Sequence, residues 1–533
     1  MKNTDVKYLE SNTLSFLNNE NAMSTLHDIR RGIERELIRT TPENHISNLS
    51  HPEELGSALM HPYITTDFAE AQLELVTPAM TERKATFDSL ASLHHFVATQ
   101  LSEDEIMWGA SMPPELPSDD EINIAAYGSS NAGQHKVRYR EGLANRYGKR
   151  MQLISGIHYN FSFPDSFWAT LHAHLGSELS LNDFISERYF HLIRNVLRNG
   201  WIIPYLFGAS PAVDKSYLVN QEHPLALFDE DTYYLPWAAT SLRLSNMGYS
   251  SNEQSLYPTS FNSKQEYLTD LCHALTTPSA RYAHLNADQQ LNGSVLQLEN
   301  ELYGSVRPKI VNDQLRPLYA MCHHGIQYIE LRSLDNNPLL PLGISEEQSH
   351  FLDAFLTYNA LAPSPELTDD ERELIARRQE LVATEGRKHG LLLPTLEGDI
   401  KLKDLGSELL DAMIPVATWL DNAFATQEHK QGIEREQAKF VDSNLTPSAQ
   451  LLAMMKEEKL SYKRATQRLS KVHFKQHQDT KIDDEEMGNL TRLVTESLVK
   501  QQQIEAQQDI SFDAFIQKKN YLQCDCEIEE AVA

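Results

Sequence analysis

Hydrophobic and polar residues alternate in five short stretches of the chain, and the polar face of each carries unusual side chains. A period of two predicts β-strands, because successive side chains of a strand point to opposite faces of a sheet. Here one face is apolar, while the other carries acids, amides, histidine or arginine in place of threonine, serine and lysine. The five stretches are GIERELI, TTDFAEAQLELVTP, GIHYNFSFP, VLQLENELYG and QYIELRSLD.

The candidate chemistry lies on these polar faces. GIERELI contributes Glu34 and Glu36, and in the second stretch Asp67 precedes a strand that carries Gln72 and Glu74. In the remaining three stretches the polar faces are His158, Asn160 and Ser162, then Gln297, Glu299, Glu301 and Tyr303, and finally Tyr328, Glu330 and Arg332.

The pentapeptide GIERE occurs twice, and its surroundings predict a different structure for each copy. The first, Gly32 to Glu36, runs into β-branched residues and a proline, which is typical of a strand. In a strand, Glu34 and Glu36 point the same way and can converge on one ion. The second copy, Gly432 to Glu436, lies among Gln, Glu, Lys and Ala and predicts a solvated helix. In a helix the two glutamates diverge by about 200°.

The rest of the chain predicts helices around these strands. Residues from about 9 to 30 have the spacing of a helix that leads into the first strand. The chain mixes short strands with helices up to about residue 343, and from 346 to about 506 its composition and spacing are helical. An acidic run near Asp483 predicts a solvated loop. We therefore expect a core over residues 1–345 and a mainly helical region over residues 346–533 packed on it.

Charge and composition narrow the classes of function. The 533 residues include 75 acidic and 47 basic side chains, and the resulting net charge of -28 repels nucleic acid and anionic membranes. The N-terminus has no apolar signal core, and the most apolar segment, GWIIPYLFGASPAV, is short and interrupted by prolines. Four cysteines are too few and too clustered for a disulfide framework. We expect a cytoplasmic protein that binds neither nucleic acid nor membrane.

A shared cavity would explain polar faces that are crowded with acids. For any single strand, a charged face exposed to solvent is the commoner arrangement, but five such strands favour a cavity. Carboxylates that share a cavity repel one another unless they are protonated or neutralised. Mg²⁺ or Mn²⁺ suits such oxygen ligands and can hold phosphate groups during phosphoryl transfer. The chain has no Walker-type loop, no Rossmann glycine fingerprint and no HExxH motif.

The same stretches, in order, resemble the blocks of the bacterial glutamate-cysteine ligase family (gamma-glutamylcysteine synthetase) of gammaproteobacterial type. The matching blocks are RRGIERE, ITTDFAEAQLELVTP, YREGLANRYG, QLISGIHYNFSFP, GWIIPYLFGASPAV, TSLRLSNMGY, LQLENELYGSVRPK and YIELRSLDNNP. The resemblance covers residues 30 to about 353 and resumes weakly at NLTPSAQLL, whereas the stretch after about residue 471 departs from the pattern. It implies a glutamine-synthetase-like α/β fold, in which a strongly curved antiparallel sheet forms an active-site funnel.

The resemblance also implies an activity. Enzymes of this family use ATP to join the γ-carboxylate of L-glutamate to the amine of L-cysteine through γ-glutamyl phosphate. The products are γ-glutamylcysteine, ADP and phosphate, in the first step of glutathione synthesis. The implied cofactor is Mg²⁺, or Mn²⁺ in its place, with ATP as a co-substrate, and we expect a monomer.

Residue by residue, the resemblance implies roles for thirteen side chains. The metal ligands fall on Glu34, Glu36, Asp67, Glu74, His158 and Glu330. Arg332 matches an arginine that contacts the transferred phosphoryl group, and Arg243 matches one near the carboxylate of the amino-acid substrate. The substrate-binding residues are Tyr139, Tyr249 and Tyr303, which match tyrosines lining the cysteine pocket, with Arg140 and Gln152 nearby. Two alternatives stay open: another carboxylate-amine ligase or a guanidino kinase on a similar sheet, and a catalytically silent Mg-nucleotide-binding protein of the same fold.

Overall fold

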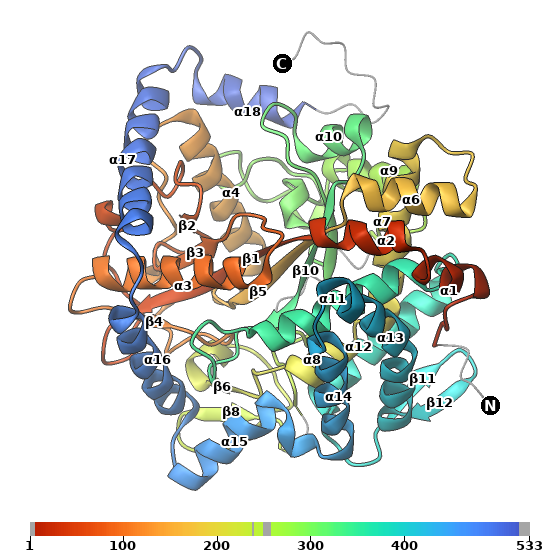
Figure 1. Ribbon diagram of the computed structural model, residues 1–533. Helices are drawn as coiled ribbons and strands as arrows, with labels where there is room; N and C mark the ends of the chain where they lie inside the picture. Colours follow the sequence, from red (N-terminus) through yellow and green to blue (C-terminus); the bar gives the residue numbers. More distant parts are fainter. Residues whose placement is uncertain (1–5, 237–238, 249–256, 522–533) are drawn as a thin grey trace.

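An antiparallel sheet surrounded by helices forms the centre of the molecule (Figure 1). The structure is a computed structural model that describes residues 6–236, 239–248 and 257–521. Within these residues the sheet has seven strands in the order β2-β3-β1-β5-β10-β9, and β4 also pairs with β1. Their bounds are β1 Arg30–Thr40, β2 Ile64–Thr66, β3 Gln72–Val76, β4 Ile106–Trp108, β5 Gly156–Ser162, β9 Val306–Lys309 and β10 Tyr328–Asp335.

The apolar faces of the predicted strands form the core. Ile33 of β1, Tyr159 of β5 and Leu331 of β10 are buried in one hydrophobic cluster with Phe351 and Phe355 of helix α11 (Glu346–Leu361). Burial of a large apolar side chain stabilises the fold by about 1.5–3 kcal/mol. Because this face of the sheet is covered by helices, the polar side chains of the same strands are directed to the opposite face.

Helices supply the remaining layers. The first half of the chain contains α1 Ser11–Leu17, α2 Glu20–Thr25, α3 Arg83–Gln100, α4 Asn131–Tyr147, α5 Lys149–Gln152, α6 Asp165–Leu175, α7 Leu181–Asn199, α8 Ile202–Phe207, α9 Lys264–Thr276 and α10 Pro317–His324. After α11 follow α12 Asp369–Glu385, α13 Leu402–Phe424, α14 Glu428–Val441, α15 Pro447–Glu458, α16 Tyr462–Asp479, α17 Asp484–Ala506 and α18 Phe512–Asn520. No helix in the described part of the chain is long and apolar enough to cross a bilayer.

Two small sheets contain the remaining strands. One consists of β6 Ala212–Asp214, β7 Ala226–Leu227 and β8 Thr232–Tyr234, and the other is the hairpin of β11 Leu392–Thr395 and β12 Gly398–Lys401. The hairpin interrupts the otherwise helical region between α12 and α13.

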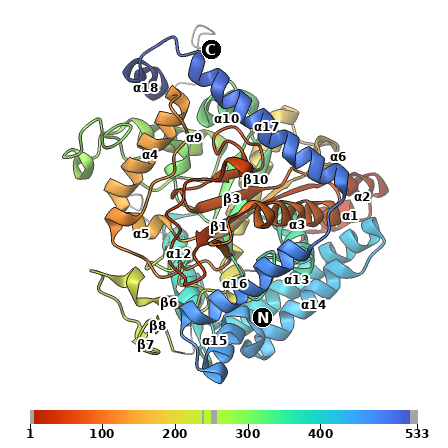
Figure 2. The same ribbon diagram turned by 90° about the vertical axis from the view of Figure 1, so that its left-hand side faces the viewer.

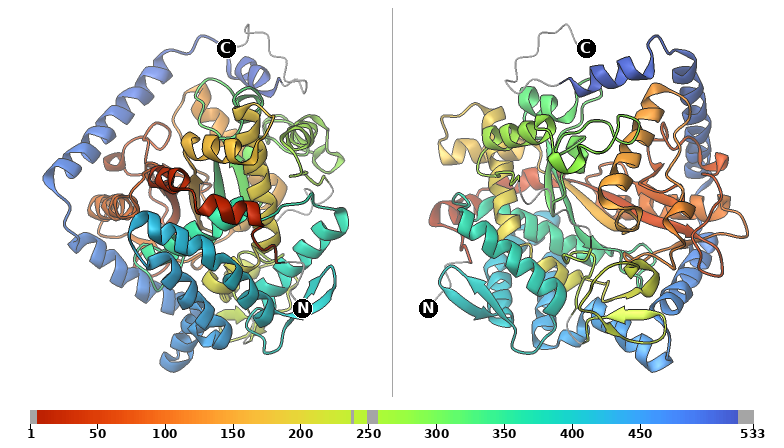
Figure 3. Two further views of the ribbon diagram at one scale, coloured as in Figure 1. Left: turned by 45° about the vertical axis from the view of Figure 1, so that its right-hand side comes forward. Right: turned by 180° about the vertical axis from the view of Figure 1, so that it is seen from behind.

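The predicted boundary between residues 345 and 346 coincides with the start of α11. The helices of residues 346–441, teal to blue in Figure 3, gather below the sheet. Residues from both sides of the boundary, such as Ile33 and Leu409, belong to the same hydrophobic cluster. The division into a core and a C-terminal region therefore stays a prediction about organisation and does not separate two hydrophobic cores.

One expected strand and one expected helix are wrong. The stretch VLQLENELYG is not a strand, because Glu299–Glu301 forms a short 3-10 helix. The helix expected from residue 9 to 30 is broken into α1 and α2, because the side chain of Asn19 accepts hydrogen bonds from the first amides of α2.

The acidic run near Asp483 is not a loop but the start of α17. Asp483 caps that helix by accepting a hydrogen bond of 2.7 Å from the amide of Glu486. The acidic residues that follow it lie in the first turn, where negative charge is favourable beside the exposed amides of a helix N-terminus.

The second GIERE copy lies in helix α14, as predicted, but it is not solvated throughout. Glu434 is exposed, whereas Glu436 is buried beside Lys439, and burial raises the pKa of the Glu436 carboxyl. The cysteine count did not predict a disulfide, but Cys272 and Cys322 are both disulfide-bonded.

Candidate active site

The pairing of β1 with its two neighbours brings the predicted acids together. In the antiparallel pair of β1 and β5, Glu34 lies opposite His158. In the pair of β1 and β3, Glu36 lies opposite Glu74. Glu330 reaches the same region from β10, which is the next strand beyond β5. Four strands that are far apart in the sequence thus contribute to one polar surface.

These side chains line a cavity of about 380 Å³, which we call the acidic cavity. All six side chains predicted as metal ligands are in its wall: Glu34, Glu36, Asp67, Glu74, His158 and Glu330. Four further predicted residues line it as well: Tyr139, Arg140, Gln152 and Arg332. The predicted cluster therefore exists as a spatial unit.

The donor atoms are close enough to share a cation. The Nδ1 atom of His158 is 2.9 Å from Oε2 of Glu34, and its Nε2 atom is 3.5 Å from Oε1 of Glu36. Two sets of donors each lie within 4.8 Å of one another: Glu34, His158 and Glu330, and Glu36, Glu74 and His158. Carboxylate oxygens with one imidazole are a ligand set that Mg²⁺ and Mn²⁺ accept, so these residues fit a divalent ion.

The carboxylates differ in how easily they ionise. Burial, together with the negative charges of Glu34 and Asp67, raises the pKa of Glu74 well above its ordinary value. Burial also raises the pKa of Glu36. For Glu330, burial acts in the same direction, but the charges of Lys309 and Arg332 outweigh it and hold the pKa well below its ordinary value. Close carboxylates of this kind would be stabilised by a cation placed between them.

A β-bulge in β10 places Arg332. The pairing of β10 with β5 runs from Leu331 opposite Tyr159 to Leu334 opposite Ile157, so β10 has one extra residue in this interval. Such a bulge changes the direction in which local side chains point. The Nη1 atom of Arg332 lies 3.2 Å from Oε2 of Glu330. Arg332 is therefore held at the wall of the acidic cavity.

A second cavity, of about 460 Å³, adjoins the first one. Arg307 and Arg332 line both cavities, so these two guanidinium groups lie where the cavities meet. Arg243 and Tyr303, predicted as substrate residues, line this second cavity. Arg243 donates a hydrogen bond of 2.8 Å to the backbone oxygen of Arg332.

The predicted substrate residues are thus divided between two connected cavities. Gln152 of the acidic cavity donates a hydrogen bond of 3.2 Å to the hydroxyl of Tyr303, which links the two walls. Arg140 stacks on the ring of Tyr127, at 4.6 Å, and donates to the backbone oxygen of Asp67. Tyr249 lies outside the described residues.

Several cavity residues were missed in the sequence, most notably cations. Lys309 donates a hydrogen bond of 3.3 Å to Glu330, and Arg307 lies 4.0 Å from the same carboxylate. Both are in the block LQLENELYGSVRPK and lie two residues apart on β9. This spacing places them on the same face of the strand and could have identified them. Lys136 lines the acidic cavity from α4, three and four residues before Tyr139 and Arg140. Burial lowers the pKa of Lys136 to about 8.

Comparison with known proteins is consistent with this geometry. An antiparallel sheet with carboxylates on one face, beside arginines and lysines, is the arrangement of an ATP-dependent ligase of glutamine-synthetase-like fold. A family model described as glutamate-cysteine ligase matches residues 14–382. The chain belongs to the glutamate-cysteine ligase family.

Individual relatives extend the match to nearly the full length. The chain is 41% identical over 522 residues to a glutamate-cysteine ligase of Pseudomonas fluorescens, covering 97% of this chain and 98% of the relative. It is 42% identical to that of Saccharophagus degradans over 510 residues, or 94% and 96% of the two chains. The stretch after residue 471, which the sequence blocks left unmatched, is therefore largely included in the similarity.

A solved structure supports the same assignment. The crystal structure of glutamate-cysteine ligase from Francisella tularensis in complex with AMP superposes with a TM-score of 0.86 at 32% identity. The match covers 92% of this chain and 97% of the other. The predicted family, fold class and enzyme class are confirmed.

Proposed function

We propose that the protein joins the γ-carboxylate of L-glutamate to the amine of L-cysteine, with ATP converted to ADP and phosphate. The observation that carries this proposal is the gathering of Glu34, Glu36, Glu74, His158 and Glu330 around one cavity, in a chain of the glutamate-cysteine ligase family. A carboxylate acylates an amine poorly. The γ-phosphoryl group of ATP is therefore transferred to the carboxylate oxygen, and the amine nitrogen then displaces phosphate from the acyl carbon.

The acidic cavity would hold Mg²⁺, or Mn²⁺, through Glu34, Glu36, Asp67, Glu74, His158 and Glu330. A bound divalent ion supplies positive charge that neutralises phosphate oxygens during phosphoryl transfer. Neighbouring groups hold these ligand side chains in place by hydrogen bonds to their carboxylates. Asn160 donates a hydrogen bond of 2.8 Å to Glu34, and the amide of Gly156 donates one of 2.6 Å to Glu36. Such contacts set the orientation of ligand groups.

Cationic side chains at the junction of the two cavities would bind the transferred phosphoryl group. Arg332 and Arg307 line both cavities, so a phosphate held between them faces the carboxylates on one side. Arginine suits this role because its planar guanidinium donates paired hydrogen bonds to phosphate oxygens. Arg243 would bind the carboxylate of the amino-acid substrate, with Tyr139, Arg140, Gln152 and Tyr303 as the surrounding substrate contacts.

A coupled assay of ADP release tests the activity. Purified protein with glutamate, ATP and Mg²⁺ should release ADP at a rate that depends on added L-cysteine, and mass spectrometry should detect γ-glutamylcysteine. Reactions without glutamate or without cysteine are the controls. A folded sample that releases no ADP in response to cysteine would falsify the proposal.

The same assay separates the alternatives. Faster turnover with another amine than with cysteine would indicate a different carboxylate-amine ligase of the same fold. Transfer of phosphate to a guanidino compound would indicate a kinase. Calorimetric binding of Mg·ATP without any turnover would indicate a catalytically silent protein.

We also propose that the protein works as a cytoplasmic monomer without nucleic-acid or membrane partners. The net charge of -28 supports the exclusion of both polyanionic partners. Light scattering after size exclusion should give a mass near 60.7 kDa over a wide range of concentrations. A mass of twice that value would contradict the proposed monomer.

A further inference from the structure

The last two helices form a segment that lies on the outside of the molecule. We call residues 484–520, which comprise α17, α18 and the connection between them, the C-terminal arm. Figure 2 shows α17 crossing in front of α3 and the sheet, with α18 continuing beyond α4. The arm is thus separated from the acidic cavity by other elements, and its role is not evident from proximity to the site.

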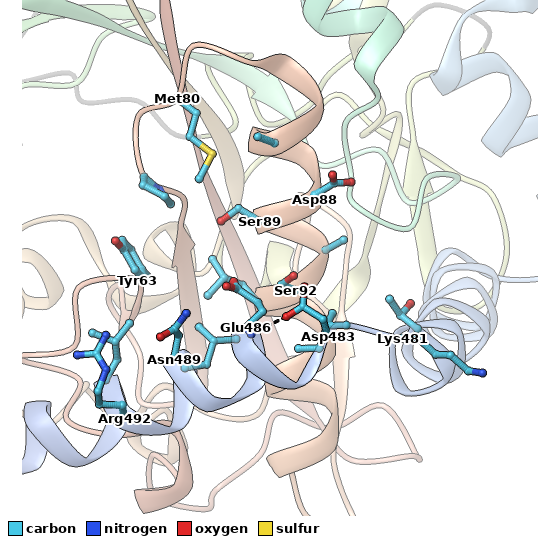
Figure 4. A pocket seen from close by; sticks show the side chains of 18 residues that line it. Tyr63, Met80, Asp88, Ser89, Ser92, Lys481, Asp483, Glu486, Asn489 and Arg492 are labelled. Atoms are coloured by element: carbon cyan, nitrogen blue, oxygen red, sulfur yellow. Dashed lines mark hydrogen bonds between the residues drawn. The ribbon is translucent and has the colours of Figure 1, made fainter.

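The beginning of the arm is attached by apolar contacts, because Leu490 belongs to the same hydrophobic cluster as Leu93 and Phe96 of α3. Beside these contacts, an open groove of about 710 Å³ lies between the first turns of α17 and α3. Figure 4 shows Ser89 and Ser92 of α3 on one wall of this groove, and Glu486 and Asn489 of α17 on the other. Within the described residues, no hydrogen bond joins these four side chains across the groove. The hydrogen bonds that hold the arm therefore lie elsewhere.

The far end of the arm binds the start of α4. Oε1 of Glu505 accepts a hydrogen bond of 2.7 Å from the amide of Ser129, and Oε1 of Gln508 accepts one of 3.0 Å from the amide of Asn131. The side-chain amide of Asn131 donates in turn to the backbone oxygen of Ile510, at 3.0 Å. The amide of Asn131 is the first of α4 and has no partner within the helix, so Gln508 stabilises the start of the helix. Glu505 fixes the residue that precedes the N-cap Ser130.

The backbone before α4 is shaped for this contact. Gly128 has a φ of +77°, in the left-handed region that residues with a side chain adopt only at a cost. A Cβ atom at this position would overlap the side chains of Glu505 and Gln501. The close approach of the arm therefore depends on glycine.

Helix α18 continues the contact along α4. The ring of Phe515 meets that of His135 edge to face at 5.9 Å, and the guanidinium of Arg138 lies over Phe512 at 5.7 Å. His135 also lines the acidic cavity, as do Lys136, Tyr139 and Arg140 on the same helix. Helix α4 is thus held by the arm and forms a wall of the cavity.

We propose that Glu505 and Gln508 are positioning residues for the ligase reaction. Gln508 binds the first amide of α4 and Glu505 binds the amide before its N-cap, and together they fix the position of the α4 surface that lines the acidic cavity. This inference rests on the proposed function, because only in the ligase reaction does that surface bind an amino-acid substrate. Neither residue touches the cavity itself, so their effect reaches the substrate through α4.

The double variant Glu505→Ala/Gln508→Ala tests the inference. The KM for L-cysteine should rise about tenfold while kcat stays within about twofold, since loss of the two hydrogen bonds at the start of α4 weakens the alignment of a binding surface and not the reacting groups. Hydrogen exchange of the amides in residues 129–134 should become faster. The matched control is Gln502→Ala/Gln503→Ala, two exposed positions on the same helix, which should change neither quantity.

A conservative variant and a binding measurement complete the design. Glu505→Gln keeps the acceptor oxygen and should retain the exchange protection and the KM of the wild type, whether or not the double variant folds well. A folded double variant with an unchanged KM would overturn the positioning role, whether or not its kcat falls. If the wild type showed no turnover, the proposed function would fail, whereas hydrogen exchange of the amides in residues 129–134 would still show whether the arm positions α4.

Discussion

At the scale of single residues, the pairing register of β1 determines which charges meet. Glu34 faces His158 across one strand pair, and Glu36 faces Glu74 across the other. A shift by one residue would turn both glutamates of β1 toward the hydrophobic core, because successive side chains alternate between faces. The acidic cavity therefore depends on the same register that buries Ile33.

Replacement of Glu34 by glutamine should abolish turnover without unfolding the protein. The substitution keeps the shape and removes a ligand charge, so kcat/KM should fall at least about a hundredfold. Steady-state kinetics and thermal melting check both parts. The control is Glu434→Gln in the second GIERE copy, where the side chain is 58% exposed. Equal losses of activity from the two variants would contradict the assignment of Glu34.

Replacement of Glu74 by glutamine should stabilise the metal-free protein at neutral and alkaline pH. The pKa of Glu74 is raised in the folded state, so between the ordinary value of 4.5 and the folded value the native protein binds a proton that the unfolded chain does not. Its contribution to stability therefore falls as the pH rises. The Glu74→Gln variant does not lose stability in this way. Its free energy of unfolding should therefore exceed that of the wild type by an amount that grows from about pH 5 upward to a value on the order of 1 kcal/mol.

Thermal melting of both proteins in EDTA at several pH values measures the effect of Glu74. Glu434→Gln serves again as the control and should follow the wild type at each pH. A Glu74→Gln variant that is less stable than the wild type at pH 8 would show that self-repulsion in the cavity is not the dominant contribution.

At the scale of elements, a buried ion cluster joins the sheet to its covering helices. Asp353 of α11 is fully buried and pairs with Arg31 of β1 at 2.6 Å and with Arg83 of α3. It also accepts a hydrogen bond of 3.0 Å from the hydroxyl of Tyr159 on β5. The four elements that meet here include both strands that carry Glu34 and His158. This cluster thus connects the core packing to the geometry of the site.

Replacement of Asp353 by alanine should destabilise the fold by about 3–5 kcal/mol, because it leaves two guanidinium groups buried without their carboxylate. Despite the opposing effect of burial, the charges of Arg31 and Arg83 hold the pKa of Asp353 below its ordinary value of 3.8. Its stabilising effect is thus complete above about pH 5 and is lost as the pH falls through the lowered pKa. Urea unfolding at pH 7 measures the change. Asp88→Ala removes an exposed pair with Lys84 on α3 and should have no measurable effect.

At the scale of the whole molecule, a large negative charge is combined with a local concentration of cations. The chain carries a net charge of -28, yet Arg243, Arg307, Lys309 and Arg332 lie beside the two connected cavities. Local cations in a low-dielectric cavity dominate the potential there, since distant surface charges are screened by salt. The protein can therefore bind an anionic nucleotide despite its overall charge.

Addition of Mg²⁺ should raise the thermal stability of the whole protein. Binding to the folded state alone, at a hundred times the dissociation constant, stabilises by about 2.7 kcal/mol. The increase should be largest at alkaline pH, where all the carboxylates are ionised. Differential scanning calorimetry with Na⁺ at equal ionic strength provides the control. The same increase in a Glu34→Gln/Glu330→Gln double variant would show that the ion binds elsewhere.

The sequence by itself determined the local elements and the chemistry that they carry. The alternation around Glu34, His158 and Glu330 predicted three strands of the central sheet, because the period of two is a property of the chain within a few residues. The resemblance of blocks to a known family supplied the residues of the site. The same local reasoning failed at Glu299 and Glu301, where alternation coincides with a 3-10 helix.

Only the tertiary structure decided which strands adjoin, where Arg332 is directed and how the C-terminal arm reaches α4. Glu301 adopts its conformation because it pairs with Arg146, 155 positions away in the chain, at 3.1 Å. Glu505 binds Ser129 across 376 positions. Contacts of this kind depend on the packing of elements that are distant in sequence, and a period measured along one segment contains no information about its neighbours in space.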